Sequence, residues 1–328
     1  MIPVVARAKT IAAIAVAIAA AALLLLAYSH YTVGHASQHV YKLRLGVEFN
    51  THATAAWIAL HNHLFQKYGI HVTKLLKFHT GLELASAMVH GEVDAAWACL
   101  APIVKMMDKG LDVYIVQAAH YYGYGCVARP GISSLKELLA KGEPRIAVPG
   151  PGTQAHILLL LAMKKYHFKA HIVFIKPPTI LEAVERGEVD AACLPEYFLS
   201  VAEARGLKIL FTAHDIWLGM PGSYLVVTGK LLHTEPRLVC LLAKVNEEAT
   251  RFALAHPDEA ARIDSEYLGI PLDIAKRSLT RLQLTTVLNV DQMQRLVDLM
   301  YSTGVIKHRI DIASRIVNLT KLCGWGGR

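Results

Sequence analysis

The hexamer Gly-Glu-Val-Asp-Ala-Ala occurs twice in this chain, at residues 91–96 and 187–192, so that the two copies lie 96 positions apart. Apolar residues with helical spacing precede each copy, and a short apolar run follows each glycine. This order predicts a helix, a glycine C-cap and then a buried strand. Because the unit recurs at a long offset, the sequence predicts two lobes of similar α/β build with a cleft between them.

The remainder of the chain fits the same plan. Short apolar strands alternate with helices from about residue 43 to residue 119, which predicts a parallel sheet covered on both faces. The alternation resumes at residue 145, residues 224–227 predict a strand that returns to the first lobe, and the pattern is helical from Pro236 onward. We therefore expect a hinged, two-lobed α/β fold with lobe 1 in residues 40–124 and 220–328 and lobe 2 in residues 125–219.

An uncharged apolar run from Ile11 to Ala27 follows two basic residues, Arg7 and Lys9. Such a run is typical of an export signal or of a single membrane anchor, since its 17 residues lie between a signal core and a membrane span of about 20 residues. Residues 1–38 are expected to form this segment and a short linker. Cleaved and tethered forms both remain open, and in either case the folded body works outside the cytoplasm.

Composition and motifs exclude several classes of protein. The chain has 328 residues, of which 54% are hydrophobic, and can bury a large core. Its net charge of +8 comes from lysines and arginines scattered singly, without a basic run interleaved with aromatic residues, so no nucleic-acid partner is expected. The sequence contains no Gly-x-Ser-x-Gly and no His-Glu-x-x-His, and we predict that it is not an enzyme.

Cysteines and histidines show no local ligand pattern. The five cysteines are odd in number, far apart and without a Cys-x-x-Cys pair, so we expect neither a disulfide framework nor a zinc site, but small buried residues. Among the 17 histidines, His61 and His63 point to different faces of a predicted helix, and His167 and His171 lie on either side of a predicted loop. We therefore predict no metal site and no cofactor.

A wider pattern is carried by residues 65–70, the two hexamers, and residues 150–153, 256–261 and 267–271. Taken in order, these stretches resemble the type II periplasmic solute-binding proteins of ABC importers, in the nitrate, sulfonate and taurine branch that includes thiamine-precursor receptors. The resemblance implies a two-lobed receptor that closes on a small ligand and passes it to a membrane permease driven by a cytoplasmic ATPase. The chain lacks the lipid-bearing cysteine of lipoprotein members, which leaves its surface attachment open.

Candidate ligand contacts lie at the turns that face the predicted cleft, and each has a structural alternative. The turn before Thr153 and Gln154 leaves backbone N–H groups at a helix N-terminus, which is a ready anion site, and the resemblance implies ligand contact there. An ordinary capped helix and core or hinge packing are the alternatives. The complete set of candidates is Asn50, Thr51, His52, Trp97, Cys99, His120, Tyr121, Thr153, Gln154, Glu196 and Trp217.

The two kinds of candidate suggest different ligands. Aromatic side chains with a few polar groups favour a flat heterocycle, whereas a helix N-terminus favours a sulfonate or carboxylate. Our hypothesis is an extracytoplasmic receptor for a small organic anion or heterocycle, with an ABC permease and its ATPase as partners. The alternatives are a pyrimidine-synthase-like enzyme of the same fold and a membrane-tethered ligand sensor, associated with the membrane through residues 11–27.

Overall fold

The computed structural model describes residues 21–22, 40–140, 142–177 and 179–325. The predicted export or anchor segment, Ile11 to Ala27, lies outside these residues except for Ala21 and Ala22. No helix among the described residues is long and apolar enough to cross a membrane. The chain divides into a unit of residues 1–40 and a unit of residues 41–328, and all that follows concerns the second.

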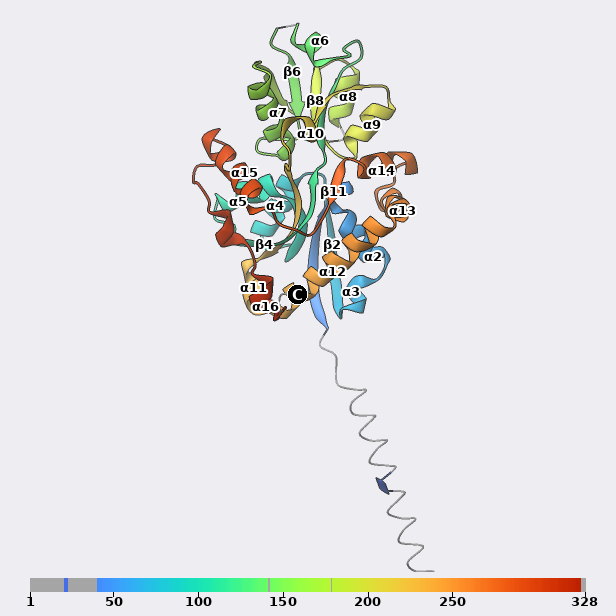
Figure 1. Cartoon of the computed structure of the whole chain (residues 1–328), viewed down its shortest axis with the longest axis vertical. Helices are drawn as coiled ribbons and strands as arrows, with labels where there is room; N and C mark the ends of the chain where they lie inside the picture. Colours follow the sequence, from blue (N-terminus) through green and yellow to red (C-terminus); the bar gives the residue numbers. More distant parts are fainter. Residues whose placement is uncertain (1–20, 23–39, 141, 178, 326–328) are drawn as a thin grey trace, which may run out of the picture. The chain divides into compact units, whose positions relative to one another are not determined.

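This unit is built on two β-sheets, each flanked by helices (Figure 1). The strand order is β11-β4-β10-β3-β1-β2 in the six-stranded sheet and β7-β6-β8-β5-β9 in the five-stranded sheet. The strands are β1 (Tyr41–Glu48), β2 (Ile70–Phe78), β3 (Ala95–Cys99), β4 (Val113–Tyr122), β5 (Tyr124–Ala128), β6 (Arg145–Val148), β7 (His171–Phe174), β8 (Ala191–Pro195), β9 (Lys208–Thr212), β10 (Pro221–Thr228) and β11 (Leu282–Leu284).

The helices follow most strands and close the chain. Those before β10 are η1 (Thr51–Ala53), α2 (Thr54–His61), α3 (Leu64–Lys67), α4 (Gly81–Val89), α5 (Leu100–Met107), α6 (Leu135–Leu139), α7 (Gln154–Lys165), α8 (Thr179–Glu185), α9 (Phe198–Ala204) and α10 (Ala213–Ile216). Those after β10 are α11 (Gly229–Thr234), α12 (Pro236–Ala255), α13 (Pro257–Leu268), α14 (Leu272–Leu279), α15 (Val290–Ser302), η2 (Ile312–Arg315) and α16 (Leu319–Cys323).

The six-stranded sheet is mixed, whereas the sequence predicts a parallel one. β1 is parallel to β2 and β3, but β10 returns from the other sheet and enters between β3 and β4, antiparallel to both. The chain first crosses between the sheets at Gly123, the single residue between β4 and β5, where φ is +86°. All strands of the six-stranded sheet come from residues 41–122 and 221–284, and those of the five-stranded sheet come from residues 124–212. The lobe boundaries themselves stay a prediction.

The two hexamers have the same backbone geometry. Gly91 and Gly187 end α4 and α8 with φ of +69° and +71°, a conformation that favours glycine. The following N–H groups, of Glu92 and Glu188, each donate to a carbonyl five residues earlier, at 2.9 Å. This is the hydrogen bond of a Schellman cap, and a buried strand follows each copy. The predicted order of helix, glycine cap and strand is confirmed.

The aspartate of each hexamer fastens the neighbouring strand. The Arg44 N–H donates to Asp94 Oδ2 at 3.0 Å, and the Arg145 N–H donates to Asp190 Oδ2 at 2.9 Å. In return, the Asp94 and Asp190 N–H groups donate to the carbonyls of the same two residues. The hexamers therefore fix the middle of β1 and the start of β6, and the far ends of both strands lead to the cleft.

The cysteines differ from the prediction in one respect. Cys240 in α12 and Cys323 in α16 form a disulfide, so the expectation of no disulfide is wrong for this pair. The sequence carries no local signal for it, because the two residues are 83 positions apart. The other three cysteines, Cys99, Cys126 and Cys193, are free and buried as predicted.

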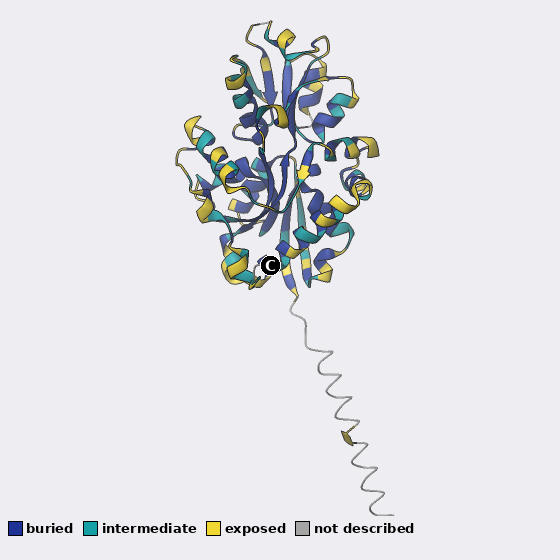
Figure 2. Ribbon diagram, viewed as in Figure 1, coloured by how far each residue is buried: buried dark blue, intermediate teal, exposed yellow. Residues whose placement is uncertain are grey.

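Buried residues concentrate on the strands and on the inner faces of the helices, while exposed residues lie on the outer faces (Figure 2). The long helix α12 illustrates the pattern, since Leu238, Leu242 and Val245 join the core that contains β1 residues such as Leu45. This packing holds β1 rigidly, and the residue that ends β1, Glu48, therefore has a fixed position.

Candidate functional site

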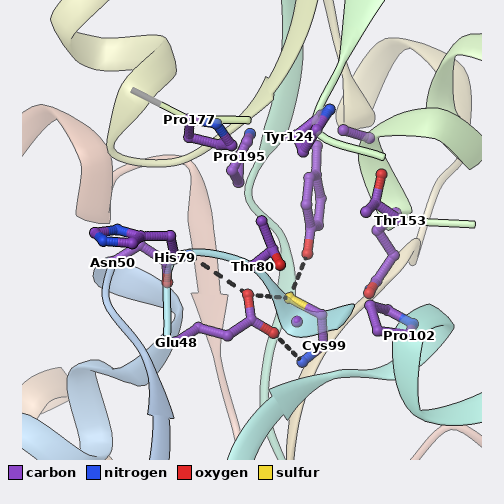
Figure 3. Close-up of a pocket in the computed structure, with 14 residues that line it drawn as sticks. Glu48, Asn50, His79, Thr80, Cys99, Pro102, Tyr124, Thr153, Pro177 and Pro195 are labelled. Atoms are coloured by element: carbon purple, nitrogen blue, oxygen red, sulfur yellow. Dashed lines mark hydrogen bonds between the residues drawn. The ribbon is translucent and has the colours of Figure 1, made fainter. Parts of the chain in front are cut away.

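A pocket lies between the two sheets, at the carboxyl ends of parallel strands, where ligands of open α/β sheets bind (Figure 3). About 340 Å³ of space in and around it is not filled by atoms, a volume that includes open solvent at the pocket mouth. The six-stranded sheet and its helices contribute Glu48, Asn50, His79, Thr80, Gly81, Cys99 and Pro102. The five-stranded sheet and its helices contribute Tyr124, Pro149, Thr153, Gln154, Ala155, Pro177 and Pro195.

Three side chains from the ends of β1 and β3 and the start of β5 form the pocket floor. Figure 3 shows the Cys99 sulfur between the Glu48 carboxylate and the Tyr124 hydroxyl. The Cys99 thiol donates to Glu48 Oε2 at 3.1 Å, and its sulfur lies 2.8 Å from the Tyr124 hydroxyl. The Cys99 backbone N–H donates to Glu48 Oε1 at 2.7 Å. A carboxyl, a thiol and a phenol thus share one hydrogen-bonded group that faces the pocket.

Burial shifts the acid–base equilibria of this floor. Desolvation raises the pKa of Glu48, although hydrogen bonds from Cys99 and Asn50 oppose the shift. Desolvation also raises the pKa of the Cys99 thiol well above its usual value, and the nearby Glu48 charge adds to the effect. The thiol therefore keeps its proton at neutral pH while it has only these protein partners.

His52 lies behind the floor and has three polar contacts. Its Nε2 lies 3.0 Å from the Gly123 carbonyl, and its Nδ1 lies 3.2 Å from Cys99 Sγ and 3.3 Å from the Tyr124 hydroxyl. A carbonyl only accepts, so Nε2 carries the ring proton, and Nδ1 is an acceptor to which the Tyr124 hydroxyl can donate. Desolvation is the largest cause that lowers the pKa of His52, and His120, whose ring centroid is 4.6 Å away, adds to it. The neutral imidazole is thus the stable form.

The pocket walls contain helix N-termini but no strong cation. Thr80 caps α4 and Thr153 caps α7, each with a side-chain oxygen that accepts a backbone N–H. Among the described residues, no lysine or arginine lines the pocket. At the start of α5 the protein itself occupies two donors, because Cys99 N–H is bonded to Glu48 and Ala101 N–H donates to Gln154 Oε1. These two donors at the start of α5 are therefore not available to a ligand, and the anion site predicted at the turn before Thr153 stays a prediction.

Two contacts near the pocket join elements of different sheets. The Gln154 side chain, from α7, donates to the carbonyls of Pro221 and Gly222 at 2.6 Å each. Lys176, beyond β7, pairs with Glu83 of α4 at 2.8 Å.

Four of the eleven sequence candidates line the pocket, namely Asn50, Cys99, Thr153 and Gln154. Thr51 and His52 lie behind it, and the Thr51 hydroxyl bonds to Ser278 at 2.6 Å. The turn after β1 directs Asn50 toward the pocket and the next two side chains into the protein, where both are buried. For this reason Asn50 lines the pocket, and Thr51 and His52 do not.

The other five candidates, all buried, do not line this pocket. Trp97 is a core residue whose indole N–H donates to Asn246 at 2.8 Å, because its position on β3 faces the helices rather than the strand end. His120 packs on His52, and the Tyr121 hydroxyl donates to the Val287 carbonyl. The Trp217 indole N–H donates to Gln292. These four pack within the protein, and Glu196 belongs to an ion pair.

Glu196 and Arg281 form a second link between the sheets. Arg281, between α14 and β11, donates to Glu196 Oε1 at 3.1 Å and to Glu203 of α9 at 2.7 Å. Glu196 also accepts from the Ser200 hydroxyl at 2.7 Å. Desolvation raises the pKa of Glu196 to about 7, although Arg281 opposes the shift. The carboxylate is thus held by a single cation from the other half of the fold.

Glu196 should make stability depend on pH. Its folded pKa of about 7 exceeds the ordinary value of 4.5, so the folded protein binds the proton more tightly. The resulting stabilisation is fully present below pH 4.5 and is lost as pH rises through about 7. We expect a loss of about 3 kcal/mol for this group. Urea unfolding of the wild type and Glu196→Gln at pH 5 and pH 8 measures it, and equal pH dependence in both proteins would contradict it.

The structure adds pocket residues that sequence patterns missed. Glu48 belongs to the predicted turn after the first strand, but nothing in the sequence distinguishes it from a solvated carboxylate. Thr80 is visible as a helix cap, and Tyr124 as one of a group of aromatic residues at the crossing. The sequence does not show that Glu48, Thr80 and Tyr124 line one pocket, because that depends on the relative position of the two sheets.

Known proteins share this architecture. The taurine-binding periplasmic protein of Escherichia coli K12 is 26% identical over 219 residues, which cover 65% of this chain and 67% of that protein. The ligand-binding component of an ABC-type import system from Staphylococcus aureus, solved with zinc bound, gives a TM-score of 0.78 at 17% identity, over 88% of this chain and 99% of that one. The alkanesulfonate-binding protein SsuA from Xanthomonas axonopodis pv. citri, bound to MOPS, gives 0.73 at 18% identity, over 86% and 99%.

These likenesses confirm the predicted fold, an α/β periplasmic-binding-protein architecture with two sheets. They also agree with the resemblance inferred from the repeated hexamer and the turn residues. A family model covers more than half of the chain, from residue 36 to residue 266, and by that match the protein belongs to the NMT1-like family.

Proposed function

We propose that this protein is an extracytoplasmic solute receptor that encloses a small organic molecule in the pocket of Figure 3 and delivers it to an ABC permease. The observation that carries the proposal is a pocket lined by both sheets and bridged by hydrogen bonds from Gln154 and Lys176. Such a pocket can release its ligand only when these bonds break. A receptor that presents its closed form to a partner needs ligand binding to be coupled to closure of the two sheets.

The lining favours a nitrogen-bearing ligand over a bare anion. Glu48 at the floor is a hydrogen-bond acceptor, and when ionised it repels an anion in a poorly solvated site. No described lysine or arginine lines the pocket to compensate. The helix ends at Thr80 and Thr153 offer partial positive charge, which suits a polar or sulfonate group at the far end of the ligand. A ligand fits both features if it places an amine or ring N–H at Glu48 and a polar or sulfonate group at the helix ends.

The other functions considered have less support. The compared proteins are named as transport binding proteins, and no observation in this pocket favours turnover of a substrate over its capture. A tethered sensor would share the pocket and would retain residues 11–27. Mass spectrometry of the native N-terminus distinguishes it from a released receptor. The partners proposed are thus the small ligand, the permease and its ATPase.

Matched ligands test the proposal. Taurine and ethanesulfonate share the sulfonate and differ in the amine, and 4-aminopyrimidine and pyrimidine form a second such pair. We expect the amine-bearing member of at least one pair to raise the free energy of unfolding by about 3 kcal/mol at 100 times its Kd, measured by thermal shift with chelator present. Glu48→Gln should weaken its binding by about 10- to 100-fold.

A matched control is Glu92→Gln, at an exposed residue just after α4 that does not line the pocket. It should change affinity much less than Glu48→Gln. Binding of nitrate or ethanesulfonate as tight as that of the amines, with no effect of Glu48→Gln, would contradict the ligand class. The absence of any stabilising ligand would contradict the receptor function.

A further inference from the structure

We propose that Glu48, His52 and Cys99 form a binding site for Zn²⁺ or a similar divalent transition metal at the floor of the pocket. The inference deepens the proposed function, because the metal would be the point at which a nitrogen of the ligand is held. Among the described residues, these three offer a carboxylate oxygen, a ring nitrogen and a sulfur that all lie within 4.8 Å of one another. Oxygen, imidazole nitrogen and thiolate sulfur are all zinc donors.

The distances between donors suit one shared metal. Cys99 Sγ lies 3.1 Å from Glu48 Oε2 and 3.2 Å from His52 Nδ1. Tetrahedral zinc, with Zn–S of about 2.3 Å and Zn–N of about 2.1 Å, places sulfur and nitrogen about 3.5 Å apart. The sulfur therefore needs to move only a few tenths of an ångström from each of these two partners, and the donor atoms of Glu48 and His52 lie within 4.8 Å of each other. The metal would replace the thiol proton, which is released to solvent.

Each of the three donors is held in place by a further contact. The Gly123 carbonyl accepts from His52 Nε2, which leaves Nδ1 unprotonated, and a histidine that ligates a metal is usually oriented by a bond of this kind. A metal at Nδ1 would replace the contact that this nitrogen makes with the Tyr124 hydroxyl. The Cys99 N–H fixes Glu48 through Oε1 and leaves Oε2 directed at the sulfur. The Tyr124 hydroxyl lies against the sulfur and can donate to a thiolate. The geometry is thus preformed without a metal.

The proposed metal site is shielded from water and borders the pocket on one side. Glu48, His52 and Cys99 are 4%, 1% and 4% exposed, so they are shielded from competing water. Glu48 and Cys99 line the pocket, whereas His52 does not, and a metal between them would have its fourth position toward the pocket. Three protein ligands and one open position define a zinc site that accepts a further molecule. With one carboxylate and one thiolate, the centre has no net charge and a neutral nitrogen donor can complete it.

Cobalt titration of the full chain, stripped with chelator, tests the site. Co²⁺ bound to a thiolate gives a near-ultraviolet charge-transfer band, so we expect one equivalent of Co²⁺ with this band, displaced by one equivalent of Zn²⁺. Cys99→Ser should abolish the band and weaken zinc binding by about 100-fold or more. His52→Gln should weaken it comparably. Cys193→Ala, at a free buried cysteine outside the cluster, should leave both unchanged.

Three outcomes would overturn the inference or separate it from the receptor function. Cobalt bound without the thiolate band, or bound equally by Cys99→Ser, would mean an adventitious site on surface histidines. If Cys99→Ser is not folded by circular dichroism, His52→Gln alone decides. A ligand that stabilises the protein equally with zinc and with chelator would overturn the metal site and leave the receptor standing. Stoichiometric binding of zinc, without binding of any organic ligand, would support the metal site and overturn the receptor function.

Discussion

Removal of the Cys240–Cys323 disulfide is expected to lower the free energy of unfolding by about 4 kcal/mol. The bond closes a loop between residues 83 positions apart, and the loss of chain entropy in the unfolded state grows with loop length. It also ties the last helix, α16, to α12, the long helix that packs on the core of the six-stranded sheet. The double variant Cys240→Ala/Cys323→Ala, unfolded in urea, measures the loss.

A reductant provides the matched control for this result. Dithiothreitol should destabilise the wild type to nearly the level of the double variant and should leave the double variant unchanged. Cys193→Ala should keep its full response to dithiothreitol, since Cys193 forms no disulfide. If wild type and double variant unfold at the same urea concentration, the bond contributes nothing to stability in solution.

Arg281→Met is expected to favour the open form and to weaken ligand binding by about 100-fold. Without Arg281 the fully buried Glu196 loses the only ion-pair partner that it has among the described residues, and breaking a buried pair in this way costs about 3–5 kcal/mol. Separation of the two sheets relieves this cost, because it returns Glu196 to water. The closed population falls, and the apparent affinity falls with it. Small-angle X-ray scattering without ligand and titration with ligand measure the two effects.

Arg277→Met is the matched control, because Arg277 pairs only with Glu203, and both side chains are more than a third exposed. Its effect should stay within about 1 kcal/mol. The Arg281→Met defect should also shrink from pH 8 to pH 5, since protonation removes the charge on Glu196, whose pKa burial raises to about 7. Scattering and affinity indistinguishable from those of Arg277→Met would contradict a role of Arg281 in closure.

Two long-range links in this protein were invisible in its sequence for the same reason. Cys240 and Cys323 are separated by 83 positions, and Glu196 and Arg281 by 85, so each pair lies on elements that are far apart in the chain. A pattern along the chain records hydrogen bonds over a few residues. It carries no information about which of two distant side chains will face each other.

The local parts of the site, in contrast, could be predicted. The turns at Asn50 and Thr153 were located because capping residues and glycines constrain a backbone within one turn of helix. Trp97 was misplaced because the sequence does not show how far along β3 the helices cover the strand, and at Trp97 they still do. Cys99, two positions further along and on the same face, lies at the strand end and lines the pocket.

By itself, the sequence determined the two α/β halves, the glycine-capped hexamers and the edge of each sheet at which a ligand would lie. These follow from short-range sterics and hydrogen bonds, which each segment satisfies on its own. Only the tertiary structure decided that Glu48, His52 and Cys99 share one floor, that Arg281 reaches Glu196, and that no described lysine or arginine enters the pocket. Those facts depend on strand register and on how the sheets approach each other, because a side chain's chemistry is set by the neighbours it acquires across the fold.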